Sequence, residues 1–132
     1  MPKYQPFDVG VPIQASDSDL VGFQWETRGI RADFIIPHDE FHLLRISFDR
    51  QCIVRILDEM PLSTEDDVTP NEGLVSEHFA YRMEGALFAR VQSELFKAGL
   101  GEKTHYRFIT GWACLDVLTS ASPSFSIIDR YD

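Results

Sequence analysis

The sequence has few cysteines and no long apolar run. Its only cysteines, Cys52 and Cys114, both lie in apolar, strand-like stretches. Two such residues do not make the disulfide framework of a small secreted protein, so we expect both to be free, buried thiols in a reducing compartment. No stretch reaches the roughly 18 consecutive apolar residues that a membrane-spanning helix needs, and we therefore expect no membrane span.

Basic residues are also scarce, because 12 Lys and Arg stand against 21 Asp and Glu, and the formal net charge is −9. Binding to nucleic acid or to an anionic membrane needs clustered Lys and Arg, so the charge argues against both. The opening MPKYQPFDVG lacks the apolar core of a secretion signal. We expect a cytoplasmic protein that binds neither nucleic acid nor membrane and whose acidity suits a basic partner.

Enzyme signatures are missing as well. No G-x-S-x-G elbow, phosphate-binding loop or dinucleotide fingerprint occurs. The run HDEFH, from His38 to His42, has histidines four residues apart, but its acid is misplaced for the zinc motif HExxH. In a strand these positions lie about 13 Å apart. We therefore expect no metal, no cofactor and no catalytic residue.

The stretch from Phe41 to Met60, FHLLRISFDRQCIVRILDEM, is the centre of the chain. Apolar residues alternate with other residues over 41–48 and again over 52–57, which is typical of half-buried strands. The short polar link Asp49-Arg50-Gln51 predicts an antiparallel hairpin between them. One face of this hairpin would be apolar, with these residues: Leu44, Ile46, Phe48, Cys52, Val54 and Ile56.

Similar alternation predicts further strands over 20–25, 30–36, 104–109 and 112–118, and a short edge contact over 125–128. Three prolines and a polar run make 1–19 an extended arm that packs loosely. The segment 61–73 has two prolines and three consecutive acids, from Glu65 to Asp67, and ends in a glycine. We interpret it as an acidic loop within a single domain that covers 1–132.

The segment 74–101 is ambiguous. Apolar residues recur every four positions from Val75 to Leu95, but this spacing drifts by about 40° per step on a helix and leaves one face. The alternative splits the segment at Gly85, with a strand over 78–84 and a helix over 86–98 that ends at Gly99. We prefer the split over one long helix.

Three runs carry a resemblance to known proteins: RILDE at 55–59, HFAYR at 78–82, and HYRFI at 105–109 together with DVL at 116–118. Together they resemble a family of small bacterial proteins of unknown function, in which a strand ending in Asp-Glu precedes a hairpin of the form HYxxxT…DVL. The similarity covers residues 41–118. It implies a compact α+β domain of bacterial origin with no known catalytic residues.

Four of the expected strands carry an arginine near their middle, and alternation places all four on the face opposite the apolar one: Arg45, Arg55, Arg82 and Arg107. Carboxylates lie on or beside the same face: Glu84, Asp116, and either Asp58 or Glu59. A ladder of cross-strand ion pairs is one interpretation. A shallow ligand-binding site for an anion is the other, because the guanidinium group matches carboxylate and phosphate.

The patterns together predict an α+β fold, in which a mostly antiparallel sheet of about six strands carries one main helix on its apolar face. The leading function is a non-enzymatic protein-interaction module that binds another protein or pairs with itself as a homodimer. A small-molecule or anion-binding domain that uses the four arginines is the alternative. A small enzyme of unknown reaction is the second alternative.

Overall fold

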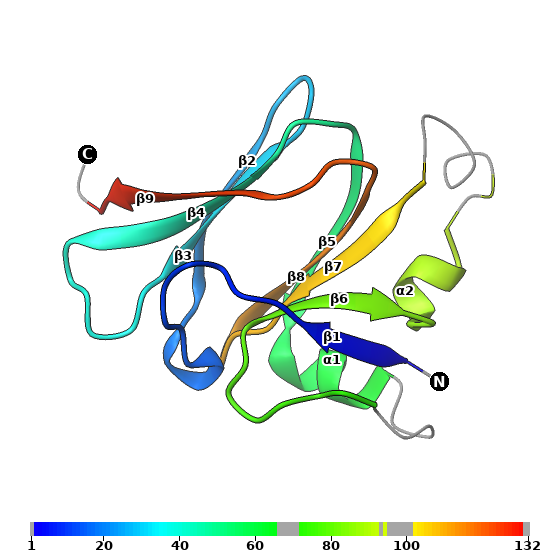
Figure 1. Ribbon diagram of the computed structural model, residues 1–132, viewed down its shortest axis with the longest axis horizontal. Coiled ribbons are helices and arrows are strands. Elements are labelled where there is room, and N and C mark those ends of the chain that lie inside the picture. The colour runs from blue at the N-terminus through cyan, green and yellow to red at the C-terminus, as the bar shows by residue number, and fades with distance from the viewer. Residues whose placement is uncertain (1, 66–71, 93, 95–101, 131–132) are drawn as a thin grey trace.

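The computed structural model describes residues 2–65, 72–92, 94 and 102–130, and these residues form two antiparallel sheets packed face to face (Figure 1). The strands are β1 (Lys3–Pro6), β2 (Leu20–Trp25), β3 (Ile30–Ile35), β4 (His42–Phe48), β5 (Cys52–Asp58), β6 (Ala80–Glu84), β7 (Thr104–Phe108), β8 (Ala113–Thr119) and β9 (Ser124–Asp129). The helical elements are the 3-10 turn η1 (Ala15–Asp17), α1 (Glu59–Glu65) and α2 (Leu87–Arg90). One sheet has the order β1-β6-β7-β8-β5 and the other the order β2-β3-β4-β9.

The core lies between the two sheets. Alternate residues of β3 and β4 point inward from the four-stranded sheet, and alternate residues of β7 and β8 meet them from the five-stranded sheet. Phe34 and Phe108 are fully buried, and their ring centroids lie 5.9 Å apart. Such aromatic pairs add to the free energy gained by removing apolar area from water. Each sheet therefore buries the apolar face of the other.

This arrangement corrects the expected fold class. The strands are mostly antiparallel, as predicted, but among the described residues nine strands divide into two sheets. The prediction of one sheet of about six strands with a main helix on its apolar face is wrong. A second sheet takes the place of that helix, and the short helices α1 and α2 lie on the outer face of the five-stranded sheet instead.

The predicted hairpin over 41–57 is also wrong. β4 pairs with β3 and β9, whereas β5 pairs with β8 in the other sheet. The link at 49–51 carries the chain from one sheet to the other. Leu44 and Phe48 still face the same core as Cys52 and Val54, because each strand turns its apolar side toward the opposite sheet.

The N-terminal residues are more firmly held than an extended arm would be. β1 pairs with β6, and Tyr4, Val9, Ile13 and Ala15 are buried. At the other end, the predicted short contact at 125–128 is a full strand, since β9 pairs with β4 along its length. Both ends of the described chain therefore complete a sheet.

The ambiguous segment does divide at Gly85, as preferred. β6 ends at Glu84, Gly85 adopts a φ of +74°, and α2 follows. Glycine suits this left-handed conformation because it has no Cβ. The rest of the expected helix over 86–98, apart from Val91, Gln92 and Glu94, and its cap at Gly99 lie outside the described residues.

The predicted acidic loop begins too early, because α1 continues to Glu65, and 66–71 lie outside the described residues. Both cysteines are free thiols, as predicted, although Cys114 is buried and Cys52 only half-buried. Within the described ranges, no helix has the length and apolar character that crossing a membrane requires.

Candidate functional site

The four arginines singled out in the sequence do not share a face. Arg45 lies on the outer face of the four-stranded sheet, where its Nε donates to Asp33 over 2.8 Å. Arg82 is opposite the core residue Tyr106, and its guanidinium lies 5.0 Å from the centre of the Phe7 ring. The prediction that the four arginines lie on one face of a sheet is therefore wrong.

The error at Arg82 has a physical cause. The prediction gave the sheet one apolar face, but Tyr81 and Met83 of β6 pack outward with Tyr4 and Ala86 in a second buried cluster. The alternation in β6 is thus real and points the other way. Arg82 takes the core-facing side, where it lies against the Phe7 ring and remains exposed.

The other two arginines do meet, on the outer face of the five-stranded sheet. Register places Asp116 of β8 between Arg107 of β7 and Arg55 of β5. Arg107 Nε and His105 Nε2 donate to Asp116 Oδ1 over 2.8 and 2.6 Å, and Arg55 Nη2 donates to Oδ2 over 2.7 Å. Arg55 also pairs with Glu65 of α1. We call these five residues the Asp116 network.

The Asp116 network holds its charges close to balance. Burial alone would raise the pKa of Asp116, but the hydrogen bond from His105 and the charge of Arg107 hold it well below its usual range. Burial lowers the pKa of His105 despite its contact with the same carboxylate, so the ring is neutral at neutral pH. Two arginines thus face two carboxylates, Asp116 and Glu65.

The outer side of the Asp116 network is covered by α2 and β1. The Phe88 ring of α2 lies 4.8 Å from Arg55 Cζ and 5.1 Å from the His105 ring centre. Arg107 Nη1 donates to the Tyr4 hydroxyl over 3.1 Å. Among the described residues, Arg107 Nη2 and His105 Nδ1 are buried without a hydrogen-bond partner.

Beside the network, at one end of the same outer face, a pocket of about 690 Å³ opens. Its apolar lining comes from β1, α1, β6 and the residue after β7, since Tyr4, Leu62, Tyr81 and Ile109 line it. The Tyr81 hydroxyl donates to the Val75 carbonyl over 2.8 Å and accepts from the Val75 amide over 3.2 Å. These two bonds fix the segment that forms one wall.

The charged groups at the pocket rim are acidic. Glu59 and Glu77 line it, and none of its described lining residues is Lys or Arg. Glu77 has a φ of +64°, a conformation that non-glycine residues adopt at a cost of about 1–3 kcal/mol. Its carbonyl accepts from the Ala15 amide over 3.1 Å, and its carboxylate accepts from Ser16 Oγ over 2.5 Å. The fold therefore tolerates backbone strain at Glu77, whose carboxylate lies at the pocket.

Apolar side chains extend outward from the pocket. Leu74 and Val75 line it and are about half exposed. Met60 and Trp112 are more exposed still, and the Trp112 carbonyl accepts from the Glu59 amide over 2.8 Å, which places the tryptophan beside the rim. Exposed apolar groups gathered at a concave site are typical of binding surfaces.

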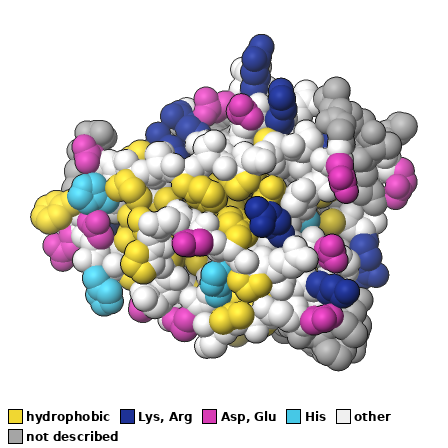
Figure 2. Space-filling view, viewed as in Figure 1, with side chains coloured by type: hydrophobic (Ala, Val, Ile, Leu, Met, Phe, Trp, Pro, Cys, Tyr) yellow, Lys and Arg dark blue, Asp and Glu magenta, His cyan; other side chains and the backbone are white. Residues whose placement is uncertain are grey.

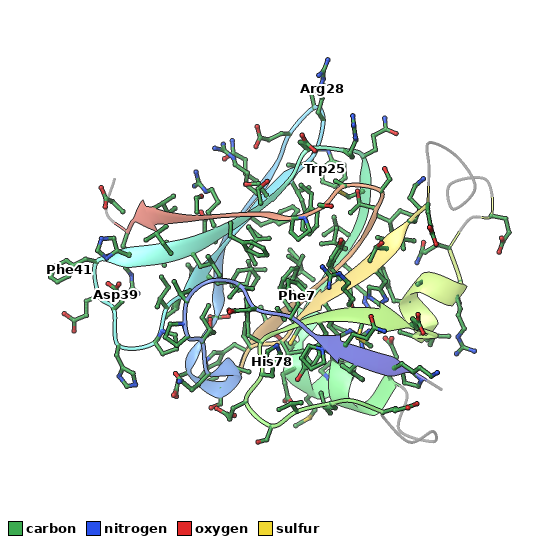
Figure 3. The ribbon with its side chains drawn as sticks, viewed as in Figure 1. Phe7, Trp25, Arg28, Asp39, Phe41 and His78 are labelled. Atoms are coloured by element: carbon green, nitrogen blue, oxygen red, sulfur yellow. The ribbon has the colours of Figure 1, made fainter. Side chains whose placement is uncertain are left out.

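The histidines and cysteines add no second site. His78 Nε2 donates to the Phe7 carbonyl over 3.0 Å, and both residues lie near the centre of Figure 3. His42 contacts Asp39, and the described part of the chain holds no cluster of three or more potential metal ligands. Burial raises the pKa of Cys114 to about 11, so its thiol stays protonated at neutral pH.

A comparison with protein-family models, curated proteins and solved structures finds no match to this chain. The resemblance to small bacterial proteins therefore stays a prediction, and the site is interpreted from its geometry. Sequence reasoning identified Arg55, Arg107 and Asp116 on one face. It missed Tyr4 and Glu65, because both were assigned to loose segments. It also missed His105, although alternation in β7 places this residue on the same side as Arg107.

The network predicts unequal roles for two aspartates that both bind an arginine on a neighbouring strand. Asp116→Asn leaves the buried Arg107 without a counter-charge and should cost about 3–5 kcal/mol in the free energy of unfolding. Asp33→Asn, at a partly exposed pair with Arg45, should cost about 1 kcal/mol or less. Urea unfolding measures both, and equal losses would contradict a structural role for the Asp116 network.

The lowered pKa of His105 predicts a pH dependence. Below pH 6.5 the unfolded chain binds a proton at this histidine more readily than the folded chain does, so stability should fall as the pH drops toward the folded pKa. His105→Gln keeps a donor for Asp116 but cannot titrate. Its melting temperature should fall less than that of the wild type between neutral and mildly acid pH. The exposed His38→Gln is the control and should behave as wild type.

Proposed function

We propose that the protein is a protein-interaction module that binds a basic, apolar segment of another protein in the pocket beside β6 and α1. One observation carries the proposal: a largely apolar pocket of about 690 Å³ has two glutamates, and no lysine or arginine, among its described lining residues. A lysine or arginine side chain suits it, because the stem packs on Tyr81 and Ile109 while the charged end reaches Glu59 or Glu77.

The surroundings of the pocket favour a protein segment over a small ligand. Met60 and Trp112 are exposed outside the pocket itself, and a ligand confined to the pocket would leave them in water. An extended chain that seats one basic side chain would also bury these apolar groups with its neighbouring residues. Buried aromatic anchors of this kind contribute strongly to protein interfaces.

Charge supports the same partner. The net charge of −9 attracts a basic segment at long range, which raises the association rate. At short range the carboxylate of Glu77 is already oriented by Ser16, so little side-chain entropy is lost on binding. We place this binding in the cytoplasm, as a proposal supported by the two free cysteines.

Paired synthetic peptides test the proposal. A peptide that alternates leucine with lysine should bind, and one that alternates leucine with glutamate should not, when tryptophan fluorescence and backbone amide shifts near Thr110 are followed. Glu77→Lys should weaken the lysine peptide about tenfold, the equivalent of 1.4 kcal/mol. The measurement is a titration at constant salt, since such binding depends on ionic strength.

Glu40→Lys is the matched control, because it changes the net charge equally at an exposed position outside the pocket lining. It should weaken binding far less than Glu77→Lys does. Equal weakening would reduce the effect to net charge and overturn the pocket assignment. Binding of free lysine as tightly as the peptide would assign the pocket to a small cation instead.

The alternative function, anion binding by arginines, makes a different prediction. Arg55 and Arg45 are matched, with 27% and 26% of their side chains exposed. Both are already paired with carboxylates, so we expect sulfate to raise the melting temperature no more than chloride at equal ionic strength. A sulfate-specific rise that persists in Arg45→Met and disappears in Arg55→Met would make anion binding the leading function.

A further inference from the structure

The strand β9 is an edge strand with little protection. It forms one side of the four-stranded sheet and pairs with β4. An exposed edge presents unpaired backbone N–H and C=O groups that can bind another strand, and proteins usually block it with charge, proline, a bulge or a covering segment. From Ser124 to Ile128, β9 has no charged residue and no proline, and its register with β4 has no shift.

The other three edges carry such protection. β1 is short and ends at Pro6, and its Tyr4 amide donates to the Glu72 carbonyl over 2.7 Å, so the Glu72 segment covers it. β2 has a register shift at Leu20 and Gly22. β5 carries Arg55 at its centre. The contrast singles out β9 as the edge open to pairing.

An apolar groove runs beside the same edge. Phe125 and Ile127 lie opposite the buried core residues Ile46 and Leu44, yet they are 37% and 48% exposed. A groove of about 510 Å³ lies between them and the chain that follows β1, where Val9 and Val11 line it together with one charged residue, Asp8. Figure 2 shows hydrophobic side chains gathered where Figure 1 draws β9 and this chain. The core is thus left partly open along β9.

We propose that two copies of this chain pair through β9, antiparallel, to form a continuous eight-stranded sheet about a two-fold axis at Ser126. In an antiparallel pair, residues directly opposite each other point to the same side of the sheet. A two-fold axis normal to the sheet therefore has to pass midway between one residue and the same residue of the other copy. Centring the pair on Ser126 places Phe125 opposite the partner's Ile127 on the core side.

This register suits the sequence of β9. It makes two aromatic–aliphatic pairs, each worth about 0.2–1 kcal/mol, and extends both cores across the junction. The only charged residue of β9, Asp129, lies opposite the partner's Pro123, so no like charges meet within the strand. One contact also satisfies both open edges at once, which closes the assembly at two copies. The occupant of the groove is then a second copy of this chain.

The dimer uses residues other than those of the proposed pocket, so the two proposals stand or fall separately. Sedimentation velocity over about a hundredfold range of concentration should show a monomer–dimer equilibrium. Because each copy carries a charge of −9, added salt should strengthen the dimer by screening repulsion. A monomer at every concentration and salt level would overturn the proposal.

Two lysine variants locate the interface. Ile127 in β9 and Val21 in β2 are both 48% exposed and lie on opposite edges of the same sheet. Ile127→Lys should raise the dissociation constant of the dimer about tenfold or more, because it places a charge in the apolar junction. Val21→Lys should change it little. Equal effects of the two variants would place the interface elsewhere.

Disulfide trapping tests the register without relying on a destabilised variant. In the proposed pairing, Ser126→Cys places the two new thiols on strands directly opposite, with Cβ atoms about 5 Å apart, so mild oxidation should yield a covalent dimer. Ser124→Cys, also at an exposed position of the same strand, places its two thiols about 13 Å apart along the strands and should stay monomeric. Trapping at both positions, or only at Ser124, would overturn the register. The wild-type chain, oxidised in the same way, shows any covalent dimer that forms through Cys52 or Cys114.

Discussion

The buried carboxylate of Asp116 is the constraint on which the outer face of the five-stranded sheet depends. A lone charge in this environment would cost several kcal/mol, so it exists only because Arg107, His105 and Arg55 donate to it. Each of those donors is in turn held by another element. Arg55 pairs with Glu65 of α1, and Arg107 bonds Tyr4 of β1. The network thereby fastens a helix and the first strand onto the sheet.

The sandwich has two buried apolar clusters, and neither is completely covered. Between the sheets, aromatic and branched residues fill the core. On the outer face, α2 and β1 cover the network, and the pocket opens beside it, lined by β1, α1 and the segment before β6. Along β9, Phe125 and Ile127 lie on the core side of the sheet but still reach the surface. Both candidate interaction surfaces are thus places where covering elements stop short of the apolar residues beneath them.

Alternation in the sequence located most strands, because a half-buried strand must place apolar residues on one side. The strands containing Phe34, Ile46, Phe108 and Val117 follow this rule. In β6 the alternation is real but the face was assigned wrongly, since Tyr81 and Met83 are buried on the outer face. Alternation also could not assign sheets: the three-residue link before Cys52 suits a hairpin locally, while the structure uses it to cross between sheets.

The candidate site was partly within reach of the sequence for the same reason. Arg55, Arg107 and Asp116 share a side of their strands by alternation alone, whereas Arg45 and Arg82 required knowledge of the sheets. Nothing local connects Tyr4 or Ser16 with residues some 60 to 100 positions later. The pocket brings together η1, α1, β6 and the end of β7, and no periodic pattern encodes such a meeting.

The sequence by itself determined the strand-rich character, the acidic charge, the free thiols and the break at Gly85. These follow from local chemistry: side-chain alternation, ionisable groups, cysteine number and the freedom of a residue without Cβ. Only the tertiary structure decided which strands share a sheet, which arginines are neutralised and where apolar surface remains open. Those outcomes depend on which faces cover one another, and covering is a property of the packed chain as a whole.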